Sequence, residues 1–223
     1  MSDGDALAGF AGFDLERAIR ARAARCGIEL GPQGARALAD HARAVIEANP
    51  LLHLTTIDEP EAFVERHLGE AFEGAALLDG DIEGTLLDLG SGNGYPGLPL
   101  TVARPGLRPL LAESSQRKAA FLNDVLQSIG STGEVIHTHV ERAQQLGARP
   151  PLRLITTRAT GGWQKILPRL TPSLEDRGQL MVWAGQEMEA VARRTAWRAL
   201  TLRQRKPLPD RDRSWIWLFD KSA

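Results

Sequence analysis

Residues 85–97 have the sequence TLLDLGSGNGYPG, in which a short apolar run leads directly into closely spaced glycines. Residues 85–89 predict a buried strand, and residues 96–103 predict the helix that follows the glycines. Glycine permits positive φ angles and lets the backbone approach a bound ligand closely. Because ligands of open α/β sheets bind beyond the carboxyl ends of the strands, this segment is the first candidate for a binding loop.

Downstream of this loop, strands and helices alternate to the end of the chain. Further strands are predicted at residues 110–113, 134–140 and 152–156, at 179–183, near Thr201 and at 214–219. Helices are predicted at residues 116–129, 163–170 and 187–197. The alternation predicts an α/β fold with a doubly wound, mostly parallel sheet of seven strands. The last two strands are expected to form a hairpin, so one strand would run antiparallel to the others.

The residues before the loop have the pattern of helices. Helices are predicted at residues 14–26, at residues 32–48 and from about residue 58 onward. Asp14 and Asp58 are the expected N-caps, the latter in a capping box with Glu61. Pro50 is expected to end the second helix, because the residue before a proline avoids the helical conformation. His67, in the third helix, is expected to be a surface or partly buried packing residue.

The chain has 223 residues, 43% of them hydrophobic, which is enough for one full domain. We expect residues 1–80 to form a helical segment packed on a ligand-binding domain of residues 81–223. A single cysteine, Cys26, excludes a disulfide framework and a cysteine zinc site, and it fits a reducing cytoplasm. The sequence has neither an apolar run long enough to span a bilayer nor a signal-peptide pattern, so we expect no membrane contact.

The formal net charge of −1 does not by itself indicate a nucleic-acid partner. Basic residues nevertheless concentrate between Val191 and Arg213, where arginines and one lysine far outnumber the acids Asp210 and Asp212. This stretch is either a solvated surface or a patch that faces phosphate groups, since the arginine fork matches phosphate geometry.

The chemistry of the loop distinguishes between two classes of ligand. Residues 92–97 match the dinucleotide pattern G-x-G-x-x-G, which alone is a weak signal. Asp88 would place a carboxylate beside a pyrophosphate, and Pro96 removes an N–H that a pyrophosphate would need. A carboxylate suits a cation instead, and S-adenosylmethionine carries an ammonium and a sulfonium group. The loop therefore favours S-adenosylmethionine over NAD.

Three further candidate residues follow strands at the same edge of the predicted sheet. Glu113 ends the second strand and is expected to accept hydrogen bonds from ribose hydroxyls. Glu141 follows the third strand and could accept from the adenine amine, which is a weak signal by itself. Arg158 follows the fourth strand, where it could hold the cofactor or an RNA phosphate, or be an ordinary surface arginine.

These segments resemble the family of ribosomal RNA small subunit methyltransferase G, also called glucose-inhibited division protein B. Residues 88–100 match its pattern of an acid, any residue and then G-[ST]-G-x-G-[FYL]-P-G-[IL]-P-L. Shorter matches lie at Leu54-Thr55, Arg66-His67, residues 117–123 and Thr157-Arg158-Ala159. The resemblance covers residues 30–220. The sequence departs from the family pattern at His53, Thr157 and Glu113, where asparagine, serine and aspartate, respectively, are usual.

The resemblance implies a class I S-adenosylmethionine-dependent methyltransferase in the cytoplasm, acting on N7 of a guanine in small-subunit (16S) ribosomal RNA. The resemblance also implies cofactor contacts beyond those argued from the loop and the strand ends. Together, the expected cofactor residues are Asp88, Gly90, Gly92, Gly94, Tyr95, Glu113, Val140, Glu141 and Arg158. The basic residues expected to contact RNA are Arg117, Lys118, Arg158 and Lys165. The expected partner is the ribosomal RNA or the small subunit, and the chain is expected to be a monomer without a metal.

Methyl transfer to N7 needs no general base, because this nitrogen carries a lone pair and no proton at neutral pH. The protein would align N7 with the methyl carbon and exclude water, so no catalytic proton-transfer residue is assigned. Trp163 could stack on an unstacked base or simply pack at the start of its helix. Two alternatives stay open, an NAD-dependent oxidoreductase and a non-enzymatic RNA-binding or ribosome assembly factor, because fold alone does not decide function.

Overall fold

A computed structural model describes residues 9–138, 151–158, 163–193, 197–209 and 211–222. It contains a seven-stranded sheet with the order β3-β2-β1-β4-β5-β7-β6. The strands are β1 Gly84–Leu89, β2 Leu107–Glu113, β3 Glu134–His137, β4 Leu152–Arg158, β5 Leu174–Gly185, β6 Leu200–Pro207 and β7 Ser214–Lys221. The first five strands pair in parallel, and β7 runs antiparallel to both β5 and β6. The predicted doubly wound sheet with a terminal hairpin is therefore confirmed.

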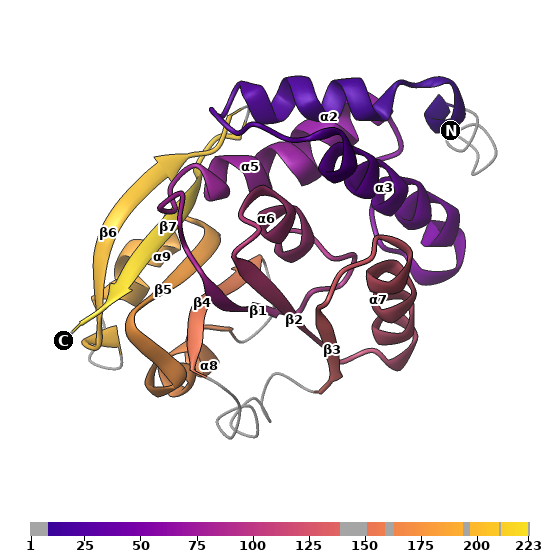
Figure 1. Cartoon of the computed structure of the whole chain (residues 1–223). Coiled ribbons are helices and arrows are strands. Elements are labelled where there is room, and N and C mark those ends of the chain that lie inside the picture. Colours follow the sequence, from indigo (N-terminus) through magenta and orange to yellow (C-terminus); the bar gives the residue numbers. More distant parts are fainter. Residues whose placement is uncertain (1–8, 139–150, 159–162, 194–196, 210, 223) are drawn as a thin grey trace.

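Helices cover both faces of this sheet (Figure 1). One face packs against α2 Leu15–Ala24, α3 Pro32–Leu52, α4 Pro60–Phe63, the π-helix Val64–Gly69, α5 Glu70–Ala75, α6 Gly97–Ala103 and α7 Gln116–Ser128. The other face packs against α8 Trp163–Leu170 and α9 Glu187–Ala192. Successive strand residues point to opposite faces, so Leu86 joins the first core and Leu87 the second.

The N-terminal helices share the first core with the sheet, because Leu38 of α3 and Leu86 of β1 belong to one cluster of buried side chains. The predicted cap of the first helix is confirmed, since the Asp14 side chain accepts a hydrogen bond from the Arg17 backbone N–H (3.0 Å). The division into a helical segment and a binding domain stays a prediction. Among the described residues, no helix is long and apolar enough to cross a membrane.

The second helix is longer than predicted, because α3 continues through Pro50. A proline in the last turn removes only one internal hydrogen bond. The Asn49 side chain accepts hydrogen bonds from the two backbone N–H groups that follow His53, both at 2.8 Å. His53 itself is left-handed (φ 49°). The helix therefore ends at His53, and the prediction that Pro50 ends it is wrong.

The third helix begins with Glu59 as N-cap and Pro60 as its first residue, so the capping box predicted for Asp58 and Glu61 is wrong. Thr55 organises this turn instead. Its Oγ1 accepts a hydrogen bond from the backbone N–H two residues later (3.0 Å) and bonds Nε2 of His67 at 2.8 Å. The sequence showed Thr55 only as part of a motif, because its partner lies more than two helical turns away.

Candidate active site

The glycine loop leaves β1 in a conformation that favours glycine. Gly90, Gly92 and Gly94 all have positive φ angles, of 69°, 53° and 88°. A Cβ atom at Gly94 would lie 2.9 Å from Nε2 of His41 and from a methyl carbon of Leu98, which is too close. The three predicted glycines therefore lie in one left-handed turn at the carboxyl end of β1, the place where ligands of such sheets approach the backbone.

Asp88 lies beneath this loop and is 1% exposed. Its Oδ1 accepts a hydrogen bond from the Thr156 hydroxyl (2.7 Å). Its Oδ2 has no hydrogen-bond partner among the described residues. Burial raises the pKa of Asp88 to about 6, against the opposing effects of Thr156, Ser91 and Arg158. The carboxylate is thus a covered negative charge, whose effect on a ligand above the loop would be electrostatic.

Glu113 ties the loop to the end of β2. One carboxylate oxygen accepts a hydrogen bond from the Gly92 backbone N–H (2.9 Å), and the other accepts from the Ser115 N–H (2.7 Å). Each carboxylate oxygen has two lone pairs. Oε1 also accepts from the Ser114 hydroxyl (3.3 Å), so Oε2, which among the described residues accepts only from Gly92, can take a further bond from a ligand hydroxyl. The structure therefore brings Glu113 against the glycine loop, as a ribose-binding acid would need.

The N-terminal helices hold the loop from its other side, in part through His41, which the sequence analysis did not single out. The Asn93 side chain donates to the carbonyl of Leu54 (3.1 Å), and the Asn93 carbonyl lies 2.7 Å from Nε2 of His41. The ring of Tyr95 stacks between His41 and His67, with centroids at 4.5 and 4.9 Å. The sequence signal that could have pointed to this contact is the position of His41, a polar residue on the apolar face of its helix.

These rings are fully or almost fully buried, and burial controls their charge. It lowers the pKa of His41 to about 4, although its hydrogen bond to Asn93 opposes this. It raises the pKa of Tyr95, whose hydroxyl has no hydrogen-bond partner within the described residues. Both side chains are thus neutral at pH 7. The structure places the Tyr95 side chain in this stack, and its contact with the cofactor stays a prediction.

Arg158 lies at the end of β4 in a cluster of charges. It donates to Nδ1 of His67 (3.2 Å) and pairs with Glu70 (3.7 Å). Arg211 and Arg66 also pair with this carboxylate, at 2.9 and 3.7 Å. Burial, assisted by Arg158, lowers the pKa of His67 to about 2, so the ring is neutral and its Nδ1 can accept. His67 is 7% exposed, which makes it a buried partner of Arg158 and not a surface residue.

Sequence reasoning did not connect Glu70 and Arg211 with this site. Burial raises the pKa of the Glu70 carboxyl, while the surrounding arginines act in the opposite direction. The indole N–H of Trp183 donates to the Glu70 backbone carbonyl (3.2 Å) and thereby fixes Glu70 against β5. Arg211 belonged to the basic stretch of residues 191–213, and the sequence gave no sign of which arginine in it would pair with Glu70.

The remaining predicted residues lie elsewhere or outside the described part of the chain. Arg117 is exposed and donates to the Leu51 carbonyl (3.0 Å), at the start of α7. Lys118 follows it in the first turn of the same helix, which Ser115 caps. Val140 and Glu141 lie outside the described residues, and the side chains of Trp163 and Lys165 are not described. Their predicted roles stay predictions.

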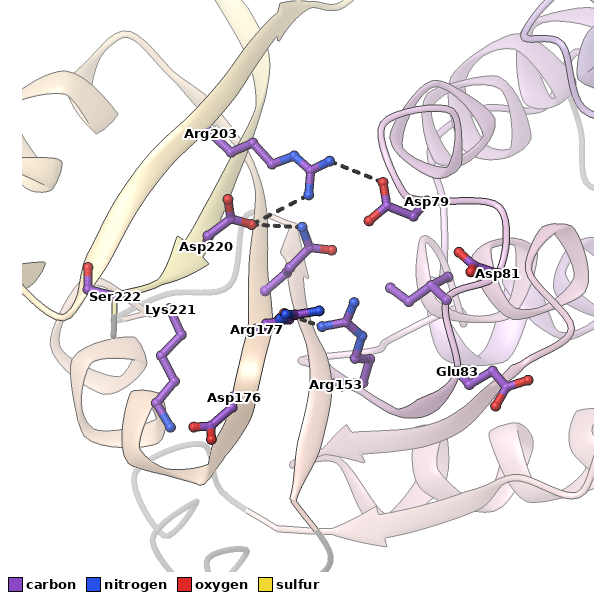
Figure 2. A pocket seen from close by; sticks show the side chains of 12 residues that line it. Asp79, Asp81, Glu83, Arg153, Asp176, Arg177, Arg203, Asp220, Lys221 and Ser222 are labelled. Atoms are coloured by element: carbon purple, nitrogen blue, oxygen red, sulfur yellow. Dashed lines mark hydrogen bonds and ion pairs between the residues drawn. The ribbon is translucent and has the colours of Figure 1, made fainter.

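Two cavities lie at opposite ends of the sheet. The smaller, of about 210 Å³, lies beside Arg158 and Glu70 at the carboxyl ends of β4 and β5. The larger, of about 930 Å³, lies at the amino ends of the parallel strands, far from the glycine loop. Figure 2 shows its charged lining, in which Arg203 pairs with Asp79 and Asp220. Ligands of open α/β sheets bind beyond the carboxyl ends of the strands. The smaller cavity lies at that end, so it is the better candidate for part of the active site.

Comparison with known proteins agrees with this architecture. The model of the family GidB, rRNA small subunit methyltransferase G, matches residues 35–207. The ribosomal RNA small subunit methyltransferase G of Sorangium cellulosum is 33% identical over 79% of this chain and 74% of its own. The enzyme of the same name from Synechococcus elongatus is 31% identical over 81% of this chain and 76% of its own.

Solved structures show the same fold at low sequence identity. MtNAS in complex with MTA and tNA has a TM-score of 0.60 at 16% identity, over 82% of this chain and 69% of its own. An rRNA methylase from Streptococcus thermophilus has a TM-score of 0.51 at 18% identity, over 67% of this chain and 92% of its own. The fold is thus the α/β, Rossmann-like fold of class I methyltransferases. From the family model and the curated relatives, the chain belongs to the rRNA small subunit methyltransferase G family.

Proposed function

We propose that this protein transfers a methyl group from S-adenosylmethionine to N7 of a guanine in small-subunit (16S) ribosomal RNA. The observation that carries the proposal is the glycine loop, held between Glu113 and the N-terminal helices over a buried acid, in a chain of this family. S-adenosylmethionine would supply the electrophilic methyl group. The residues described here would bind and orient it.

The residues present fit this cofactor. Gly90, Gly92 and Gly94 have left-handed backbone conformations, and a Cβ at Gly92 would meet little else of the protein, which leaves room for a ligand there. Glu113 can accept from a ribose. Asp88 supplies negative charge that attracts a sulfonium or an ammonium and has an oxygen without a hydrogen bond in the described structure. We propose Asp88, Gly90, Gly92, Gly94, Tyr95, Glu113, Val140, Glu141 and Arg158 as the cofactor-binding residues.

Catalysis would rest on positioning, because N7 of guanine has no proton to lose. Holding the reacting groups in line can contribute about 7–11 kcal/mol in favourable cases. The two histidines nearest the loop are neutral and engaged, His41 with Asn93 and His67 with Thr55 and Arg158. Their engagement fits a reaction that needs no general base.

RNA binding would come from the cluster around Glu70 and from exposed basic residues. Arg66, Arg158 and Arg211 share one carboxylate, which leaves positive charge beside the proposed cofactor site. Such charge attracts phosphate groups. Arg117, Lys118 and Lys165 are further proposed contacts. We propose that the protein acts in the cytoplasm as a monomer on ribosomal RNA or the small subunit, and light scattering would test the oligomeric state.

The test is methyl transfer to small subunits from cells that lack this gene. The protein and labelled S-adenosylmethionine are incubated with these subunits, and the ribosomal RNA is digested and mapped by mass spectrometry. We expect 7-methylguanosine at one position. A protein that binds the subunits without transferring a methyl group would instead be an assembly factor, and calorimetric binding of NAD but not S-adenosylmethionine would support an oxidoreductase.

A further inference from the structure

The smaller cavity lies on the side of the sheet edge that the proposed cofactor contacts leave open. In the sheet, β1 is flanked by β2 on one side and by β4 on the other, and β5 follows β4. The glycine loop and Glu113, as proposed cofactor contacts, would hold an adenosyl group over β1 and β2. The cavity lies over β4 and β5, so a molecule within it would meet the cofactor across the end of β4.

The walls of the cavity combine apolar and charged groups. Trp183, Ala184 and Leu208 contribute apolar surface, whereas Arg158 and Arg211 contribute positive charge. An apolar surface beside charged groups that converge on one cavity suits a small planar molecule with a polar edge, such as a nucleobase. Arginines at the same wall can bind a phosphate of the same nucleotide.

Two carboxylates line this cavity, and they differ in what they already bind. Glu70 is buried and surrounded by three arginines. Glu187 is exposed, and its Oε1 accepts a hydrogen bond from the Gly185 backbone N–H (3.0 Å), which fixes the side chain at the cavity. Its Oε2 accepts no hydrogen bond in the described part of the chain and lies over Gly185, where a Cβ would collide with it. Glu187 is therefore the carboxylate available to a ligand.

Guanine offers a carboxylate two adjacent donors, N1–H and the 2-amino group, which lie on the edge away from N7. Enzymes that act on an extruded base commonly recognise this edge through hydrogen bonds, and an ionised carboxylate only accepts. Adenine has an acceptor at N1 and no 2-amino group. Because Glu187 follows β5 and the glycine loop follows β1, a guanine that faces Glu187 with its N1 edge would direct N7 toward the cofactor.

Resting on the proposed function, we propose that this cavity receives the target guanine and that Glu187 accepts hydrogen bonds from its N1–H and 2-amino groups. Glu187 is then the residue that selects guanine. Arg158 and Arg211, on the same wall, hold the phosphate of the nucleotide.

The test compares guanine with inosine, which keeps N7 and N1–H but lacks the 2-amino group. Small subunits are reconstituted with ribosomal RNA that carries either base at the mapped position, and kcat/KM is measured for each. Wild-type protein should prefer guanine by about tenfold or more, the usual effect of one hydrogen bond to a charged group. Glu187→Gln should lower kcat/KM for guanine by about 10- to 100-fold and reduce the preference toward 1.

Glu189→Gln is the matched control, since Glu189 lies in the same helix and pairs with Arg205. It should behave as wild type. Glu187→Asp keeps the carboxylate and should retain more of the preference for guanine than Glu187→Gln. Calorimetry with S-adenosylmethionine and thermal unfolding establish that each variant is folded and binds the cofactor.

The outcomes are distinct. A Glu187→Gln variant that keeps the wild-type preference for guanine over inosine overturns the assignment of Glu187. The assignment of Glu187 is also overturned if Glu187→Asp and Glu187→Gln lose the preference for guanine equally. If wild-type protein methylates neither substrate, the proposed function itself is wrong, and the inference is overturned with it.

Discussion

At the scale of single residues, the buried carboxylate of Asp88 lowers the stability of the fold. Its pKa is about 6 in the folded protein, because burial disfavours the charged form, against an ordinary value of 3.8. Between about pH 4 and pH 6 the folded state binds the proton more tightly, so stability falls as pH rises through this range. A difference of about 2 in pKa corresponds to about 3 kcal/mol, lost in full above pH 6. A charge retained at this cost fits a role in cofactor binding.

The substitution Asp88→Asn separates stability from binding. The variant keeps an oxygen that can accept from Thr156, and we expect it to be more stable than wild type at pH 7, by up to about 3 kcal/mol. The gain should shrink as pH falls and disappear below about pH 3, where the wild-type carboxyl is protonated in both states. Binding of S-adenosylmethionine at pH 7 should weaken by about tenfold, because an attractive charge is lost.

Denaturant unfolding between about pH 3 and pH 8 and calorimetry with the cofactor at pH 7 would measure both effects. Asp124→Asn, at an exposed position of α7, is the control and should change neither quantity. An Asp88→Asn variant that binds the cofactor as tightly as wild type would contradict the electrostatic role.

At the scale of elements, α3 and the glycine loop form one unit. His41 reaches from α3 to the Asn93 carbonyl and stacks on Tyr95. Beyond β1 and β2, the loop is held by His41, by the hydrogen bond from Asn93 to Leu54 and by the stacking of Tyr95 on His67. Because loops are the more mobile parts of a fold, we infer that the N-terminal helices keep the left-handed glycines in their ligand-binding conformation.

The substitution His41→Ala would remove this connection. It leaves a cavity among fully buried groups, and we expect a loss of about 2–4 kcal/mol in the free energy of unfolding. Cofactor affinity should fall as well, because the Asn93 carbonyl loses its partner. Arg36→Ala, on the exposed side of the same helix, should leave both quantities near wild type. Equal cofactor affinity in folded His41→Ala and wild-type protein would refute the coupling.

At the scale of the whole molecule, charge is distributed unevenly in spite of a net charge of −1. Arg66, Arg158 and Arg211 gather around one carboxylate at the carboxyl end of the sheet. At the amino end, Arg203 is paired with Asp79 and Asp220. RNA should therefore bind at the carboxyl end, where three arginines gather around Glu70.

Salt dependence measures this asymmetry. Affinity for small subunits should fall steeply with ionic strength, and Arg211→Ala should reduce the slope of log affinity against log salt by about 1, the loss of one phosphate contact. Arg203→Ala, at the opposite end of the sheet, should leave the slope unchanged. Identical slopes for wild type and Arg211→Ala would exclude Arg211 from the RNA-binding surface.

The sequence by itself determined the order of the elements, the sheet type and the place of the binding loop. These features depend on local patterns, such as the apolar run before Gly90 and the alternation of strands and helices that follows it. The helix boundaries at Pro50 and Asp58 were wrong, because side chains of Asn49 and Thr55 satisfy backbone groups that local propensity does not consider.

The surroundings of the loop came only from the tertiary structure. His41 and Glu70 reach the site from N-terminal helices, and Arg211 and Glu187 reach it from the other end of the chain. Neither the spacing nor the composition of the sequence relates these segments. They meet because the sheet brings the ends of β1, β4 and β5 together. The energy that fixes them is the burial of helices on the sheet, which depends on the whole fold and not on any one stretch of sequence.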